Sequence, residues 1–296
     1  MSSPTRLPPR SPLREGALSH QVLASSRLFT SLRVLAQTGS TNADLLAEAR
    51  TGAAAGAVLI AEEQTAGRGR LDRSWHSQPG AALTFSVLLR PSQVPASRRG
   101  WLPLLTGVAM ASALRAAAGL QVSLKWPNDV LASAGPPGGS GKLAGILAEQ
   151  AGDAIVVGVG LNVSASQDEL PSVQATSLWL EGAPGLDREA ILVGALRELE
   201  QRYLRWCETT PPGDADTSGL RDDYLRYCAT IGQDVQVELP GGSVLAGRAE
   251  DVDTAGCLLV SAGGTMHVVS AGDVVHVRRC DLWPQRPVSP RAKNSS

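Results

Sequence analysis

An alternation of glycine and arginine, Gly67-Arg68-Gly69-Arg70, stands in a polar stretch between two apolar runs of the chain. Glycine lets a backbone approach an anion closely, and guanidinium groups make charge-assisted, often bidentate hydrogen bonds to phosphate or carboxylate. The alternative for these four residues is a solvated basic turn. Trp75 follows in the same polar stretch, where its indole would either anchor the loop on the core or offer a stacking surface to a nucleobase or a cation. Together with Trp75, the two arginines favour an anion-binding loop.

A second polar cluster, Lys125-Trp126-Pro127-Asn128-Asp129, follows an apolar run that begins at Val122. The proline excludes a helix and a central strand position, so Lys125 is expected at or near the end of a strand. One interpretation of the cluster is a turn capped by an Asn or Asp side chain. The other is a phosphate-binding edge with Asp129 near a hard cation such as Mg²⁺, which prefers oxygen ligands.

Two glycine-containing segments fail the common nucleotide-binding patterns. Gly141-Lys142 has Pro136 and Leu143 where the phosphate-binding loop of NTPases needs Gly and Ser or Thr. The run Gly158-Val-Gly160-Leu-Asn162-Val163 has a valine in place of the third glycine of the dinucleotide fingerprint. We interpret this run as an inner strand whose small residues either serve core packing alone or admit a flat ligand or another backbone. The four histidines form no metal-binding cluster in the sequence.

The periodicity of apolar residues predicts the elements that hold these clusters. Ser40, Thr41 and Asn42 are residue types that cap helices, and the spacing after them predicts a helix that ends at Gly52. Further helices are predicted at 101–118, 187–206 and 217–228, and strands at 58–61, 83–89, 122–126, 143–149 and 155–163.

The two ends of the chain differ from its centre in composition. Residues 1–33 are rich in Arg, Ser and Pro, which predicts a flexible tail, and their prolines disfavour the amphipathic helix of a transit peptide. From 230 to 281, short alternating runs with glycine turns predict a small β-barrel. The expected organisation is a tail at 1–33, a larger domain at 34–229, the barrel at 230–281 and a disordered tail at 282–296.

Charge and cysteine usage exclude several classes of protein. The 296 residues carry 27 Lys+Arg and 28 Asp+Glu, so the chain has no electrostatic footprint for nucleic acid. Its apolar stretches are shorter than the roughly 20 residues of a membrane helix, and we expect no membrane partner. The four cysteines lie more than twenty residues apart, which disfavours a zinc knuckle or redox dithiol and indicates reduced thiols in a cytoplasmic protein.

Taken in order, five motifs resemble those of the biotin protein ligases, in the monofunctional type without a DNA-binding domain. The motifs are Ser40-Thr41-Asn42, Gln64 to Arg70 with Trp75, Lys125 to Asp129, Gly141 to Glu149 and Gly158 to Val163. The resemblance spans residues 40–163 and extends through the barrel. It implies an α+β fold, in which a mixed β-sheet flanked by helices forms the catalytic domain at 34–229 and a small C-terminal β-barrel follows.

The resemblance also implies a reaction in two steps. The carboxylate of biotin attacks the α-phosphorus of MgATP, giving biotinyl-5′-AMP and pyrophosphate. A lysine of a biotin carboxyl carrier protein or domain, belonging to acetyl-CoA carboxylase or a related acyl-CoA carboxylase, then attacks the mixed anhydride and releases AMP. Such chemistry needs preorganised cations, because two anionic groups must meet. Biotin, ATP and Mg²⁺ are therefore the implied ligands.

Roles for single residues follow from the same resemblance. The implied catalytic residues are Arg68, Arg70 and Lys142, around the carboxylate and the α-phosphate. Biotin binding is implied for Ser40, Thr41, Asn42, Gln64, Gly67, Arg68, Gly69, Arg70, Lys142, Gly158, Gly160 and Asn162. ATP binding is implied for Arg70, Trp75, Lys125, Asn128, Lys142 and Asn162, with Trp75 covering the adenine, and metal binding for Asp129.

Two departures from the family pattern and three rival functions accompany this interpretation. Asp72 replaces a glycine that the family commonly has in the loop, and residues 133–140 lengthen the link to Lys142. A bifunctional repressor is disfavoured, because about 33 polar residues are too few for a DNA-binding module before the larger domain. A lipoate ligase or lipoyl transferase would lack the Gly-Arg-Gly-Arg loop in this form. A non-catalytic biotin-binding module would need fewer cations than the chain offers.

Overall fold

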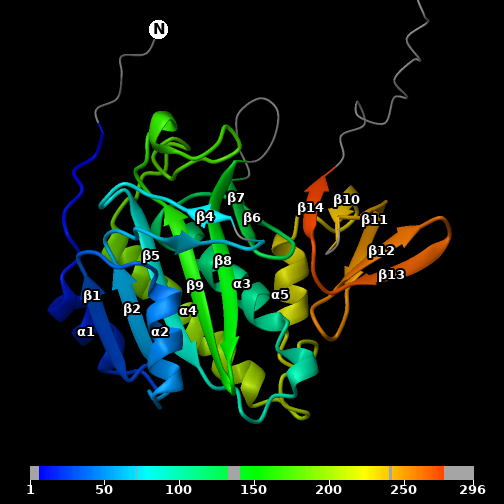
Figure 1. The fold of residues 1–296 in the computed structure, drawn as a ribbon, viewed down its shortest axis with the longest axis horizontal. Coiled ribbons are helices and arrows are strands. Elements are labelled where there is room, and N and C mark those ends of the chain that lie inside the picture. The colour runs from blue at the N-terminus through cyan, green and yellow to red at the C-terminus, as the bar shows by residue number, and fades with distance from the viewer. Residues whose placement is uncertain (1–6, 72, 133–140, 240–241, 277–296) are drawn as a thin grey trace, which may run out of the picture.

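In the part of the chain that the structure describes, seven strands form a mixed sheet in the order β1-β2-β5-β9-β8-β7-β6 (Figure 1). The computed structural model describes residues 7–71, 73–132, 141–239 and 242–276. β1 and β2 are parallel. Every other neighbouring pair in this order, from β2–β5 to β7–β6, is antiparallel. The strands are β1 (Ser31–Leu35), β2 (Ala57–Ala61), β5 (Ala82–Leu89), β6 (Val122–Lys125), β7 (Asp129–Ala132), β8 (Lys142–Ala151) and β9 (Ala154–Asn162).

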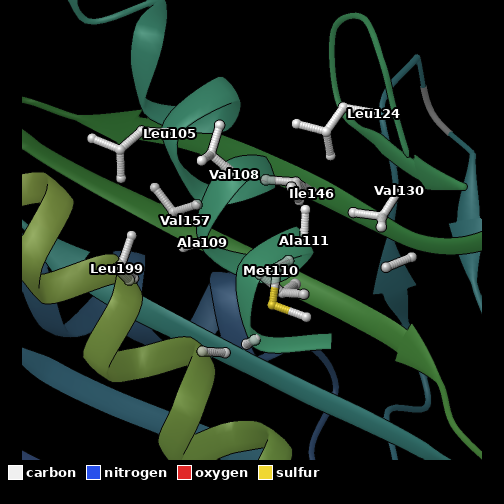
Figure 2. Packing of buried hydrophobic residues seen from close by; sticks show 14 of the residues in the cluster. Leu105, Val108, Ala109, Met110, Ala111, Leu124, Val130, Ile146, Val157 and Leu199 are labelled. Atoms are coloured by element: carbon white, nitrogen blue, oxygen red, sulfur yellow. The ribbon is translucent and has the colours of Figure 1, made fainter. Parts of the chain in front are cut away.

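Helices cover the two faces of this sheet unequally (Figure 1). One face carries α2 (Thr41–Arg50), whose Leu45, Leu46 and Ala49 pack on a small cluster of buried residues from the sheet. The other face carries α3 (Trp101–Ala117) and α4 (Arg188–Cys207), and this side holds the main hydrophobic core. Figure 2 shows side chains of α3 packed against Ile146 and Val157 of the sheet and Leu199 of α4. The α2 side therefore has room for a site.

The N-terminal segment is ordered, so the prediction of a flexible tail at 1–33 is wrong for the residues from 7 onward. It forms α1 (Glu15–Leu23), which packs on α4 and β1, and it supplies the edge strand β1. Its apolar side chains are buried in the main core, namely Leu13, Leu18, Val22, Phe29 and Leu32. The polar average of the whole segment concealed these residues, and the prolines of the sequence all precede residue 13 in this segment.

A second sheet follows the helix α5 (Leu220–Tyr227). Among the described residues as far as His276, its five antiparallel strands have the order β13-β12-β11-β10-β14, in agreement with the predicted small barrel. The indoles of Trp101 and Trp126 donate to the carbonyls of Thr254 and Gly256, which ties this sheet to the larger domain. The strands are β10 (Asp234–Glu238), β11 (Val244–Val252), β12 (Leu258–Ala262), β13 (Thr265–Val269) and β14 (Asp273–His276). The predicted tail at 282–296, together with Cys280, lies outside the described residues.

The predicted helices and the predicted strands of the larger domain are all present, with ends shifted by a few residues. Sequence reasoning missed β1, which begins within the segment that was assigned to a flexible tail. It also missed β7, which begins inside the cluster that was interpreted as a turn. The cluster is the turn of a β6–β7 hairpin in which Lys125 pairs with Asp129. A further hairpin joins β3 (Gly67–Arg68) to β4 (Ser74–Trp75). None of the described helices has the length and apolar character of a membrane span.

Candidate active site

A cavity of about 710 Å³ opens on the α2 side of the sheet, and the predicted site residues gather around it. Its walls come from the N-terminus of α2, the 64–75 loop, strands β5 and β7 to β9, residues 171–175 and β14. Of the sixteen predicted site residues, Gly67 is the one that does not line the cavity. The remaining fifteen are Ser40, Thr41, Asn42, Gln64, Arg68, Gly69, Arg70, Trp75, Lys125, Asn128, Asp129, Lys142, Gly158, Gly160 and Asn162.

The N-terminus of α2 and Gln64 form the polar end of the cavity. Ser40 caps the helix by accepting a hydrogen bond from the backbone of Ala43. The backbone N–H of Thr41 donates to Oε1 of Gln64 at 2.8 Å, and its hydroxyl lies 3.0 Å from the same oxygen. This contact fixes which way the buried Gln64 amide faces.

Ser86 is a buried residue of this end that sequence reasoning missed. Its hydroxyl lies 2.7 Å from Thr41 Oγ1 and donates to Asn42 Oδ1 at 2.6 Å. The amide nitrogen of Asn42 donates to the carbonyl of Leu147 and to Glu149. Asn42 is therefore held by protein partners on both ends of its amide. The available signal was a polar residue within the apolar run of β5.

Two glycines that were predicted to bind biotin make room for protein side chains. A Cβ on Gly158 would lie 2.1 Å from Asn42 Oδ1, and one on Gly160 would lie 2.4–2.8 Å from the indole of Trp75. In this structure the small residues of the strand leave room for side chains of the protein itself, the amide of Asn42 and the indole of Trp75, and the approach of a flat ligand stays a prediction. Gly67 has a different role, because a Cβ there would lie 2.4 Å from the carbonyl of Trp75 and would block the β3–β4 pairing.

The indole of Trp75 consequently lies on β9, the strand that was predicted to be the floor for biotin. Its ring nitrogen is buried and has no hydrogen-bond partner among the described residues. Coverage of adenine by Trp75 stays a prediction.

Basic residues dominate the other end of the cavity. Five basic side chains line it against two carboxylates, Asp129 and Asp273; the basic residues are Arg68, Arg70, Arg73, Lys125 and Lys142. Asp129 lies between two ammonium groups, 2.6 Å from Lys142 Nζ and 3.8 Å from Lys125 Nζ. The excess of positive charge suits a polyanionic ligand.

The two arginines of the loop have different environments. Arg68 forms an ion pair with Glu149 at 3.1 Å and is half exposed, whereas Arg70 is more deeply buried and lies 3.4 Å from Asn128 Oδ1. Burial lowers the pKa of Arg70, although Asp273 and Asp129 oppose the shift. A guanidinium stays charged at neutral pH even so, and its field acts more strongly where water is excluded.

The C-terminal sheet supplies a wall that the motifs did not indicate. Gly272, Asp273, Val275 and His276 line the cavity from β14. Asp273 forms an ion pair with Arg73 at 2.5 Å, and His276 Nε2 lies 3.1 Å from Thr230 Oγ1. Burial, with a smaller contribution from Lys125, lowers the pKa of His276. A separation of about 200 residues between Arg73 and Asp273 hid this contact from local sequence patterns.

The described residues contain no cluster of three or more His, Cys, Asp or Glu side chains that could hold a metal ion by themselves. A single carboxylate such as Asp129 still fits Mg²⁺, which usually binds through one or two carboxylates together with substrate phosphates. The predicted departure at Asp72 and the segment 133–140 lie outside the described residues.

Comparisons with known proteins identify the class of this site. The model of the biotin/lipoate A/B protein ligase family matches residues 34–164, and that of the biotin protein ligase C-terminal domain matches residues 230–277. The biotin--[acetyl-CoA-carboxylase] ligase of Mycobacterium tuberculosis is 46% identical over 91% of this chain and 97% of its own length. The bifunctional ligase/repressor BirA of Bacillus spizizenii is 31% identical over 81% of this chain and 71% of its own length.

A solved structure agrees with these sequence matches. The biotin protein ligase from Aquifex aeolicus in complex with biotin and ATP superposes with a TM-score of 0.67 at 27% identity, covering 84% of this chain and all of that one. The chain belongs to the biotin/lipoate A/B protein ligase family and, within it, to the biotin protein ligases.

Proposed function

We propose that the protein activates biotin with ATP and transfers it to a lysine of the biotin carboxyl carrier domain of acetyl-CoA carboxylase or a related acyl-CoA carboxylase. The observation that carries the proposal is that Arg68, Arg70 and Lys142 line one cavity with the polar end at Thr41 and Gln64. The M. tuberculosis relative, which is named for this activity, supports the choice of biotin and of the carboxylase.

The cavity divides into two ends that suit the two substrates. At the polar end, Ser40, Thr41 and Gln64 offer hydrogen-bonding groups for the ureido ring of biotin. Strand β9, on which Asn42 and the Trp75 indole lie at Gly158 and Gly160, would form the floor of the cavity beside that ring. At the basic end, Lys125, Asn128 and Lys142 face the phosphates of ATP. Trp75 lies at the junction, where it would separate the ring of biotin from the nucleotide.

The first step joins two anions, and the basic groups between the two ends lower its barrier. The biotin carboxylate attacks the α-phosphorus, a new oxygen–phosphorus bond forms, and pyrophosphate leaves with the electrons of the bond that breaks. Arg68, Arg70 and Lys142 neutralise the charge that would otherwise keep the reactants apart. Asp129 holds the Lys142 ammonium group at 2.6 Å, which keeps it oriented before the reaction.

Mg²⁺ fits the basic end when it arrives with the ATP phosphates. Asp129 is the carboxylate we assign to it, and the ion would share this carboxylate with the Lys142 ammonium group. The ion would supply charge neutralisation of the leaving pyrophosphate.

In the second step, the amine of the carrier lysine attacks the carbonyl carbon of the mixed anhydride. The amide bond forms and AMP leaves with the electrons of the broken acyl–oxygen bond. The reaction is proposed to take place in the cytoplasm, where the free thiols of Cys207, Cys228 and Cys257 would stay reduced.

Exchange of labelled pyrophosphate into ATP tests the first step. The expected result is exchange that requires biotin and is not supported by lipoate. Exchange without either acid, or with lipoate alone, would contradict the proposal. Mass spectrometry of a carrier domain incubated with enzyme, ATP and biotin tests the second step, and the expected product carries one biotinyl group on its lysine.

A further inference from the structure

Arg10 connects the N-terminal segment to the loop that begins at residue 163, directly after strand β9. It donates to both carboxylate oxygens of Glu169, at 3.0 and 2.6 Å, and to the hydroxyl and carbonyl oxygens of Ser164, at 3.2 and 3.0 Å. Both side chains of the ion pair are only about a fifth exposed. The Arg10 side chain lies so close to Gly80, another neighbour of this loop, that a Cβ there would come within 2.9 Å of it.

The loop that Arg10 holds also bonds the last residue of β9, Asn162, and the backbone of Lys142. Ser164 comes two residues after the end of β9, and the segment continues to Pro171, Ser172, Gln174 and Ala175, which line the cavity. The backbone of Lys142 donates to Gln174 at 2.7 Å and accepts from Thr176 at 2.9 Å. The amide of Asn162 donates to the carbonyl of Thr176 as well. Arg10 therefore restrains one end of a segment whose other end is hydrogen-bonded to the backbone of Lys142 and to the side-chain amide of Asn162.

A second contact of the same segment reaches the loop of Gln64. The backbone N–H of Leu13 donates to Glu62 at 2.6 Å, two residues before Gln64. Arg188, which is only 6% exposed, donates to Glu62 at 2.7 Å and to the carbonyl of Ser11 at 2.6 Å. Charge-assisted hydrogen bonds of this kind are strong when they are buried, so the segment is held firmly against the Glu62 carboxylate.

We propose that residues 10–13, the N-terminal brace, position the biotin end of the cavity, with Arg10 as a positioning residue for strand β9 where it ends at Asn162. The brace contacts the loops of Gln64 and Ser164. At the basic end, Lys125, Asn128 and Asp129 belong to the β6–β7 hairpin, to which none of the bonds of Arg10, Ser11 and Leu13 described above goes. Lys142 is bonded to the segment after β9 through its backbone, whereas its ammonium group is held by Asp129 of that hairpin. The proposal rests on the proposed function, because it assigns the affected end of the cavity to biotin.

Arg14 provides a matched control within the same segment. Its guanidinium also makes two hydrogen bonds to a carboxylate, Glu189, at 3.1 and 2.7 Å. Glu189 lies in the first turn of α4 and does not line the cavity, and the Arg14 side chain is 76% exposed. The substitutions Arg10→Ala and Arg14→Ala thus each remove an arginine that makes two hydrogen bonds to one carboxylate, with and without a connection to the site, and Arg10→Ala also removes the two bonds to Ser164.

The test is biotin-dependent ATP–pyrophosphate exchange by the full chain, with the KM of each substrate measured separately. In Arg10→Ala, the KM for biotin is expected to rise by about tenfold, which is less than the roughly hundredfold effect that a 1 Å misplacement can have. The KM for ATP is expected to change by less than about threefold, which is the effect of losing one exposed ion pair. Arg10→Lys should restore part of the biotin KM because it keeps the charge, and Arg14→Ala should resemble the wild type.

Three outcomes would overturn the brace. One is an unchanged KM for biotin in a folded Arg10→Ala variant, and another is an equal rise for Arg14→Ala. The third is an equal rise in the KM of both substrates that follows the fall in melting temperature, which would make the contact merely structural. Failure of the wild type to exchange with biotin would instead contradict the proposed function, so the two proposals fail separately.

Discussion

The two faces of strand β9 show how one strand serves both stability and chemistry. Ile155, Val157, Val159 and Leu161 point into the main core beneath α3 and α4. Between them, Val156 packs under α2, and then Gly158, Gly160 and Asn162 line the cavity. Side chains alternate across a strand, so neighbouring residues experience opposite environments. The packed face excludes ligand by filling space, whereas the other face borders the cavity, and its two glycines leave room there for the side chains of Asn42 and Trp75.

The largest expected effect comes from the cavity face, at Lys142. Lys142→Ala removes an ammonium group held 2.6 Å from Asp129, and loss of one preorganised charge costs on the order of 10²–10³ in rate. We expect biotin-dependent pyrophosphate exchange to fall by that factor while the melting temperature stays near that of the wild type. Normal release of pyrophosphate by a folded Lys142→Ala variant would remove Lys142 from the mechanism.

On the packed face, Leu161→Ala should lower stability and leave substrate binding almost unchanged. Leu161 is fully buried, and truncation of such a side chain costs about 2–5 kcal/mol of unfolding free energy. Denaturant unfolding should show this loss, while the KM values for biotin and ATP change little below the unfolding transition. A large rise in KM with unchanged stability would mean that the two faces are not separate in function.

The adjacent residue gives the converse result. In Gly160→Ala the new Cβ would lie 2.4 Å from the indole of Trp75, so the ring must move. Overpacking costs roughly 1–3 kcal/mol, and here the cost falls on the position of Trp75 at the cavity. We expect the KM for biotin to rise about tenfold, with intrinsic fluorescence reporting the displaced indole. Leu161→Ala is the control for effects of altering the strand itself.

Sequence reasoning succeeded on the cavity face where a local motif carries the chemistry. Each of the five motifs lies within a short stretch, so the resemblance to the family could be recognised from them, and fifteen of the sixteen residues that it implied line one cavity. The glycines of β9 indicated a close approach, because glycine inside a strand often marks one by a ligand or by another part of the chain, but they did not indicate which of the two. At Gly160 the approaching group is the indole of Trp75.

The failures concern contacts between distant segments. Asp273 reaches Arg73 across 200 residues and Arg10 reaches Glu169 across 159, and neither partner has a motif of its own. The prediction of an N-terminal tail was wrong for a related reason: Leu18 and Val22 are buried by α4 and β1, and composition alone does not reveal such partners. Tertiary packing stabilises α1, although the mean composition of the polar segment around it disfavours a folded element. The absence of nucleic-acid binding stays a prediction.

A smaller effect is expected at the wall that the C-terminal sheet contributes. Arg73→Ala breaks the ion pair with Asp273, and since Arg73 is 61% exposed the pair should contribute about 1 kcal/mol or less. We expect a rise of about twofold to fivefold in the KM for ATP, which shrinks at high salt because exposed charges are screened. Arg33→Ala, which breaks an exposed pair with Glu48 away from the cavity, should leave both KM values unchanged. Equal KM effects in the two variants would contradict a specific role for the wall.

The smallest expected effect is on the pH dependence of stability, through the ion pair between Arg10 of the brace and Glu169 of the loop after β9. The hydrogen bond from Arg10 is the main cause that lowers the pKa of Glu169 from 4.5 to about 2. Because the folded state binds this proton less readily, the contribution to stability is complete above about pH 4.5 and is lost as the pH falls towards 2. Glu169→Gln should therefore lower the unfolding free energy by about 1 kcal/mol or less at neutral pH, as expected for a partly exposed pair. In urea titrations at several pH values, the gap between wild type and variant should narrow between pH 4.5 and 2. A gap that stays constant over this range would mean that Arg10 does not hold Glu169 in its ionised form, which would contradict the role of this ion pair in holding the loop that follows β9.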